Sequence, residues 1–181
     1  MKLLILAAAT LFAGSAIAPP APAPVVQSQT PDVIYVPTPP AVVEAMLDMV
    51  ELRDGDVLYD LGSGDGRIPI AAAKRVKVRA VGIDIDPARI KEANANAKAA
   101  GVTGEVTFKQ ADLFTSDFSD ATVVTLYLLD TLNEKLRPKL LAELKPGTRI
   151  VSHAFRMGDW EPEKEETIDG RAIYYWTVPE R

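Results

Sequence analysis

The chain has 181 residues, of which 48% are hydrophobic and 25% are charged, and its formal net charge is -5 at pH 7. This length and composition predict a single globular domain. The chain contains no cysteine, which excludes disulfides, thiol catalysis and cysteine-ligated zinc. It also has no long basic run, so nucleic acid is disfavoured as a partner.

The N-terminus has the pattern of a secretory signal. Lys2 precedes the apolar run Leu3–Ala13, which is too short to span a bilayer, and Ala16–Ala18 matches an A-x-A cleavage site. We therefore expect residues 1–18 to be a signal peptide or a retained anchor, and residues 19–32 a Pro/Ala-rich linker. The protein would be exported or membrane-associated, and cytoplasmic-facing if the segment stays as an anchor. A mistaken start codon is the alternative.

From residue 33 onward, strand and helix patterns alternate up to residue 155. An amphipathic helix is expected around residues 42–50, followed by helices near 66–75, 88–100 and 132–144. Strands are expected near 56–61, 79–84, 105–109, 121–128 and 148–155, and a hairpin over 164–168 and 171–178 turns at Asp169-Gly170. This order predicts an α/β, Rossmann-like domain over residues 33–181, with a mostly parallel sheet and a C-terminal antiparallel hairpin.

A glycine-rich turn, Asp60-Leu61-Gly62-Ser63-Gly64-Asp65-Gly66, links the first strand to the next helix. The following strand ends in Asp84, where an acidic side chain can hold ribose hydroxyls. A dinucleotide site requires G-x-G-x-x-G, but Arg67 occupies the third position and Asp65 would repel pyrophosphate. The pattern D-x-G-x-G-x-G instead resembles motif I of the seven-stranded class I S-adenosylmethionine (SAM) methyltransferases. The resemblance implies SAM as the cofactor and no metal ion.

Ligands of such sheets bind beyond the carboxyl ends of the strands. The expected cofactor contacts there come from the turn, from the tip of the second strand and from the tip of the third: Asp60, Gly62, Ser63, Gly64, Asp84, Ile85, Asp112 and Leu113. In this prediction Asp84 binds ribose, Ile85 packs on adenine, and Asp112 accepts from the adenine amino group. The alternative for Asp84 is a second helix cap beside Asp86, and the alternative for Asp112 is a helix or turn cap.

Four further residues have two possible assignments each. Thr38 could donate its hydroxyl to the methionine carboxylate of SAM, in a segment from Tyr35 to Pro40 that walls the site, or cap the first helix. Tyr127 could line the methyl-acceptor channel as the catalytic-site residue, or be a half-buried strand tyrosine. Asp130 could accept a proton from an amine or cap the next helix, and the cap is preferred. His153, the only histidine, is expected to be structural rather than a base.

The run Asp60–Ile68 with Ile70–Lys74 resembles the signature of the family of lysine methyltransferases that act on the c-ring protein of ATP synthase, together with their bacterial relatives. Tyr35–Thr38 and Arg149–Val151 are similar to that family before motif I and around the fifth strand. The resemblance implies methyl transfer to a protein lysine, and it allows a membrane segment at the N-terminus. The residues alone leave two alternatives open. The methyl acceptor could be a small molecule, or the chain could be a secreted SAM-fold binding protein without catalysis. The chain departs from the family pattern at Tyr127–Asp130, beside the acceptor.

Cleavage of the N-terminal segment can be measured directly. If it is a signal peptide, the mature protein will start near Ile17 or Pro19 and lose Lys2, which shifts the net charge by one unit from -5 to -6. Mass spectrometry of the protein from its source cell checks this. An intact Met1 in a soluble cytoplasmic fraction would contradict export, whereas an intact Met1 in a membrane fraction would indicate an anchor.

Overall fold

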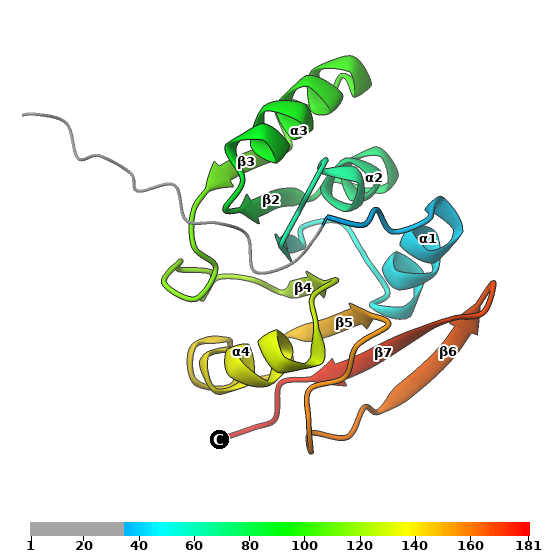
Figure 1. Cartoon of the computed structure of the whole chain (residues 1–181), viewed down its shortest axis with the longest axis vertical. Coiled ribbons are helices and arrows are strands. Elements are labelled where there is room, and N and C mark those ends of the chain that lie inside the picture. The colour runs from blue at the N-terminus through cyan, green and yellow to red at the C-terminus, as the bar shows by residue number, and fades with distance from the viewer. Residues whose placement is uncertain (1–34) are drawn as a thin grey trace, which may run out of the picture.

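The structure, a computed structural model, describes residues 35–181 (Figure 1). The predicted signal peptide at 1–18 and linker at 19–32 lie outside these residues. Within the part of the chain that is described, no helix combines the length and apolar content needed to cross a membrane.

Seven strands form one sheet in the order β3-β2-β1-β4-β5-β7-β6. The first five strands are parallel, and β7 runs antiparallel to both β5 and β6. The arrangement confirms the predicted Rossmann-like class I methyltransferase fold with its antiparallel C-terminal hairpin. The strands are β1 (Val57–Leu61), β2 (Arg79–Asp84), β3 (Val106–Gln110), β4 (Val123–Leu126), β5 (Arg149–His153), β6 (Lys164–Ile168) and β7 (Arg171–Thr177).

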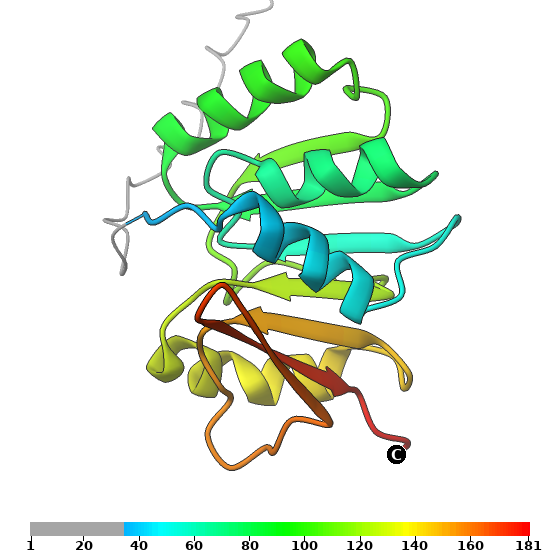
Figure 2. The same cartoon turned by 90° about the vertical axis from the view of Figure 1, so that its right-hand side faces the viewer.

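Four helices within residues 35–181 cover both faces of the sheet: α1 (Pro40–Met49), α2 (Arg67–Arg75), α3 (Pro87–Ala100) and α4 (Asp130–Glu143). Figure 2 shows α1, α2 and α3 together on one face and α4 on the other. From β1, the strands β2 and β3 follow one another toward one edge of the sheet, whereas β4 and β5 follow one another toward the other edge. Because parallel crossovers are right-handed, this reversal puts α4 on the opposite face. The switch point between β1 and β4 is where such sheets bind ligands.

Local sequence signals account for several element ends. The α3 helix begins after Asp86, whose carboxylate accepts from the Ala88 amide at 2.7 Å, and Pro87 occupies its first turn. The hairpin turn has positive φ at both Asp169 (50°) and Gly170 (75°), as a two-residue type I′ turn requires. The position of the hairpin turn confirms the prediction from sequence.

The strands of the sheet centre are shorter than predicted at their carboxyl ends. Register pairs Leu61 with Leu126, and Leu126 with Ser152. After Leu61 the backbone of β1 turns into the glycine motif, so Tyr127 has no partner in β1. β4 therefore ends at Leu126 instead of residue 128, and β5 ends at His153 instead of residue 155. This shortening frees Tyr127 and Leu128 to leave the sheet.

A buried ion pair fixes the end of α1 against the sheet. Arg149, at the start of β5, pairs with Asp56 and donates to the carbonyl of Glu51 at 2.9 Å. Arg149 and Asp56 are both buried, and such pairs are costly to break because a lone buried charge remains. The anchor holds α1 in place, and the opposite end of α1 continues into the segment that crosses the site.

Candidate active site

A cavity opens at the carboxyl edge of the parallel strands. Of the ten site residues predicted from sequence, nine line it: Thr38, Asp60, Gly62, Ser63, Asp84, Ile85, Asp112, Leu113 and Tyr127. Segments separated in the chain therefore meet as predicted. Gly64 is the exception, because it lies beside the cavity and not among its lining residues.

The glycine turn, Gly62–Gly66, has its backbone in the left-handed region at all three glycines, with φ of 87° at Gly62, 51° at Gly64 and 79° at Gly66. Its first two amides, Gly62 and Ser63, both donate to the carbonyl of Ile83 at 2.8 and 3.0 Å. A Cβ on Gly64 would lie 2.2 Å from the ring of Tyr35. Gly64 thus accommodates a neighbouring side chain, which explains why it does not face the cavity.

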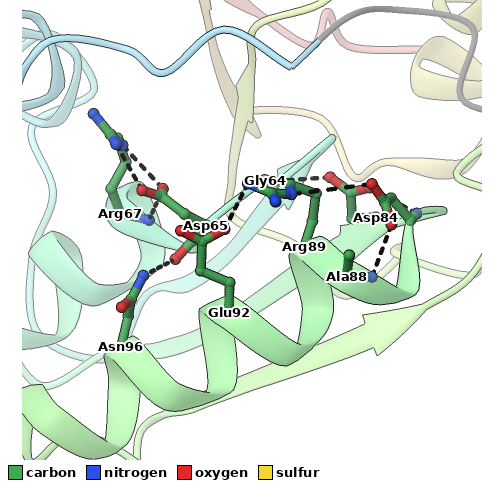
Figure 3. Close-up of polar contacts among 9 residues, drawn as sticks. Gly64, Asp65, Arg67, Asp84, Ala88, Arg89, Glu92 and Asn96 are labelled. Carbon is green, nitrogen blue, oxygen red and sulfur yellow. Dashed lines mark hydrogen bonds and ion pairs between the residues drawn. The ribbon is translucent and has the colours of Figure 1, made fainter.

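Asp84 connects β2 to the glycine turn. Its Oδ2 accepts from the Gly64 amide at 2.8 Å, and its Oδ1 accepts from the Asp86 amide at 2.9 Å (Figure 3). Asp84 does not cap α3, because the cap of that helix is Asp86, and the Asp84 carboxylate lines the cavity. Each carboxylate oxygen has two lone pairs, so both oxygens keep the capacity to accept from hydroxyls of a ligand.

Asp60 is a buried carboxyl group at the floor of the cavity. It is 2% exposed and accepts from the Thr125 hydroxyl at 2.7 Å. The pKa of Asp60 is raised to about 7, mainly because the carboxyl group is buried. The hydrogen bond from Thr125 lowers this pKa, and the negative charges of Asp84 and Asp65 raise it. Within residues 35–181 no cationic side chain pairs with Asp60. The cavity therefore has a place for a positive group of a ligand.

Asp65 and Arg67, the two residues that depart from a dinucleotide motif, form an ion pair. Arg67 Nε and Nη2 donate to the two carboxylate oxygens at 2.9 and 2.6 Å (Figure 3). Although burial raises the pKa of Asp65, the hydrogen bonds and charge of Arg67 hold it below its usual value. Arg67 therefore pairs with a nearby acid of the glycine turn.

Residues 35–39, here called the strap, cross the cavity as one of its walls. Four of them, Tyr35, Val36, Pro37 and Thr38, line it. The Tyr35 ring covers Gly64 and stacks under the guanidinium of Arg89, 4.9 Å from the ring centroid. The structure places the strap where the sequence predicted a wall, and its contribution to cofactor binding stays a prediction.

The alternative assignment of Thr38 as a helix cap is wrong. The residue before α1 is Pro39, and no side chain caps that helix. Thr38 is buried instead, with its hydroxyl 3.1 Å from His153 Nδ1. The sequence could not show this partner, because it lies 115 positions further along the chain.

The loop between β4 and α4 lines the cavity too. Tyr127 lines the cavity, and its ring centroid lies 3.9 Å from that of His153 and 6.1 Å from that of Phe155. His153 is buried at the end of β5, as its structural assignment predicted. The assignment of Asp130 as a helix cap is wrong, because α4 begins at Asp130 itself and the carboxylate accepts from the Arg156 amide at 2.9 Å.

Sequence reasoning missed several lining residues, among them Asp86, Arg89, Phe114 and Leu132. Arg89 follows the cap Asp86 by one helical turn, and this spacing could have indicated that it lies beside the same cavity. Phe114 and Leu132 carry no such signal, because a loop aromatic or a helical leucine has the same pattern in any core.

Comparisons with known proteins identify the family. A model of the ANTKMT methyltransferase domain matches residues 60–164. A protein-lysine N-methyltransferase from Saccharolobus islandicus is 46% identical over 158 residues, covering 84% of this chain and 98% of that protein. The chain belongs to the ANTKMT methyltransferase domain family. An adenine nucleotide translocase lysine N-methyltransferase from Mus musculus is 35% identical over 128 residues, covering 71% of this chain and 56% of that protein.

Similar solved structures lead to the same enzyme class. An RNA methyltransferase from Salinibacter ruber in complex with S-adenosyl-L-homocysteine (SAH) is 55% identical with a TM-score of 0.79, covering 81% of this chain and 95% of that one. Together with the family, this identifies a class I SAM-dependent methyltransferase. The acceptors named for these relatives differ, since one is RNA and the others are protein lysines.

The cavity of this chain fits SAM in charge and in hydrogen bonding. Its ionisable lining is mainly acidic, with Asp60, Asp65, Asp84, Asp86 and Asp112 against Arg67 and Arg89. An acidic site suits the sulfonium and ammonium groups of SAM and repels a pyrophosphate. The buried hydroxyl of Ser63 also has no hydrogen-bond partner among the described residues, and a polar ligand would supply one.

We predict that Asp84 contributes two charge-assisted hydrogen bonds to the ribose. Charge-assisted bonds are worth about 1.5–3 kcal/mol each, so Asp84→Ala should weaken SAH binding at least about tenfold in calorimetric titration. Asp120→Ala is the matched control, because it also removes a carboxylate but from an exposed pair with Arg79. Unchanged affinity in a folded Asp84→Ala protein would contradict the ribose assignment.

We predict a pH dependence of SAH binding that comes from Asp60. Since the pKa of Asp60 in the cofactor-free protein is about 7, the carboxylate that attracts the ligand ammonium is lost as the pH falls below 7. Affinity should then fall by up to about tenfold per pH unit below 7, and it should level off around pH 8, as long as the ligand ammonium keeps its proton. Asp60→Asn should flatten the profile. 5′-Methylthioadenosine, which lacks the amino acid, should bind without this dependence; the same slope for both ligands would contradict the assignment.

Proposed function

We propose that this protein transfers the methyl group of SAM to the ε-amine of a protein lysine. The observation that carries the proposal is its 46% identity, over 84% of this chain and 98% of the other, with a protein-lysine N-methyltransferase. The family match and the murine lysine N-methyltransferase of the adenine nucleotide translocase support the same acceptor chemistry. SAM supplies an activated methyl group as a sulfonium.

The residues of the chain then have mainly a positioning task. Methyl transfer needs the nucleophile in line with the bond that breaks, more than it needs an acid or base. We assign Asp84 to the ribose, Asp60 to the ammonium and Asp112 to the adenine amino group, so that the methyl group faces Tyr127. Tyr127 would form the channel wall along which the lysine side chain enters.

The mouth of the cavity supports a protein acceptor. Only three large apolar side chains are exposed among residues 35–181, namely Tyr35, Val36 and Leu129. Two belong to the strap, and Leu129 directly follows the cavity residues Tyr127 and Leu128. Exposed apolar groups gathered at a site suit contact with a polypeptide, and the acidic lining suits a lysine side chain.

RNA is the second candidate acceptor, because the Salinibacter ruber protein that is 55% identical is described as an RNA methyltransferase. Nucleic-acid binding depends on cationic side chains that neutralise phosphates. Here the chain carries a net charge of -5, and both arginines of the cavity are paired with carboxylates, Arg67 with Asp65 and Arg89 with Glu92. These charges favour the lysine acceptor over RNA.

A labelling experiment distinguishes the two acceptors. The enzyme and methyl-labelled SAM are incubated with an extract of the source organism, and the Asp84→Ala variant provides the background. We expect label in protein that resists ribonuclease and disappears when the extract's lysines are acetylated beforehand. Mass spectrometry should then find the methyl groups on lysine. Label that ribonuclease removes would assign RNA as the acceptor instead.

A further inference from the structure

Thr38 is fixed from two sides by residues distant in sequence. Its carbonyl accepts from Arg67 Nη1 at 2.8 Å, and its hydroxyl lies 3.1 Å from His153 Nδ1. Both Thr38 and His153 are buried, at 3% and 1% exposure, while Thr38 still lines the cavity. The backbone and the side chain of Thr38 are therefore both held in place at the wall of the cofactor site.

The direction of the Thr38–His153 hydrogen bond decides what Thr38 offers to a ligand. A hydroxyl has one proton to donate. If the hydroxyl donates to His153, only its lone pairs remain for the cavity. If His153 Nδ1–H donates to the hydroxyl, the hydroxyl proton is free to turn toward a ligand.

The surroundings of His153 favour the second direction. Burial, and then the charge of Arg171, lower the pKa of His153 to about 4, so the imidazole is neutral and carries a single N–H. Within residues 35–181 the only hydrogen bond of the ring is the one at Nδ1. A proton on Nδ1 has the Thr38 hydroxyl as its acceptor, whereas a proton on Nε2 has no acceptor among the described residues.

The cavity also needs a donor of this kind. The methionine carboxylate is the one anionic group of SAM, and it must bind in a cavity whose ionisable lining is mainly acidic. The two cavity arginines are already engaged, Arg67 with Asp65 and Thr38, and Arg89 with Glu92. A hydroxyl whose proton is free can donate to that carboxylate without adding a competing charge.

We propose that His153 is a positioning residue for the cofactor. As the Nδ1–H tautomer it donates to Thr38, and so it directs the Thr38 hydroxyl proton at the methionine carboxylate of SAM. The inference rests on the proposed function, because it requires that SAM occupies this cavity.

The tautomer can be observed directly. His153 is the only histidine of the chain, so a ¹⁵N-labelled full-length protein carrying no additional histidine gives one imidazole signal set in long-range ¹H–¹⁵N spectra. With SAH bound at about pH 7.5, where a group with so low a pKa is neutral, we expect a protonated Nδ1 and an unprotonated Nε2. A protonated Nε2 with a bare Nδ1 would overturn the proposal.

Substitutions separate positioning from folding. His153→Asn keeps an amide N–H near the place of Nδ1, whereas His153→Gln puts its amide near Nε2 and cannot reach Thr38 in the same way. Thr38→Val removes the hydroxyl, and Thr38→Ser retains it. We expect His153→Gln and Thr38→Val to weaken SAH binding about tenfold or more, as for the loss of one hydrogen bond to a charge, while His153→Asn and Thr38→Ser retain most of the affinity.

5′-Methylthioadenosine is the second probe in calorimetric titration, because it has the nucleoside and thioether of SAH but no carboxylate. Its affinity should stay within about twofold in all four variants. Equal losses for both probes would show a merely structural effect and overturn the inference, as would unchanged SAH binding by His153→Gln. If the unaltered protein binds neither probe, the proposed function is refuted. If the unaltered protein and all four variants bind both probes equally well, only the role of His153 is refuted.

Discussion

The hydrogen bond from the Gly64 amide to the Asp84 carboxylate is the contact on which the site depends. It joins the turn after β1 to the tip of β2 at 2.8 Å. The bond is possible because three glycines of the turn take positive φ, which a side chain would oppose. With the turn fixed in this way, Asp60, Ser63 and Asp84 face one cavity from two neighbouring strands.

The charge of this cavity explains the preference for SAM over a dinucleotide in physical terms. Arg67 neutralises Asp65 next to the turn, while Asp60 stays buried without a cation among the described residues and has a raised pKa. Burying an unpaired carboxylate is unfavourable, and a cationic ligand offsets that cost when it binds. The same residues that exclude pyrophosphate thereby provide part of the affinity that we assign to the ammonium of SAM.

The strap makes the site a product of the tertiary structure and not of motif I alone. Arg67, the first residue of α2, donates to the strap backbone, and His153 at the end of β5 contacts Thr38 of the strap. Tyr35 covers Gly64, so the strap and the turn pack directly on each other. A single cavity wall thus joins the N-terminal segment, β1 and β5, and His153 places Tyr127 of the acceptor side next to the same wall.

The sequence by itself determined the alternation of strands and helices, the glycine turn, the acidic tips of β2 and β3, and the type I′ hairpin. These features depend on local backbone preferences and on the rule that parallel strands end at one edge. Only the tertiary structure decided that β4 stops at Leu126, that Asp130 binds the Arg156 amide, and that Thr38 contacts His153 instead of capping α1. In each case the deciding partner lies on another element, up to 115 positions away, where no local pattern can specify it.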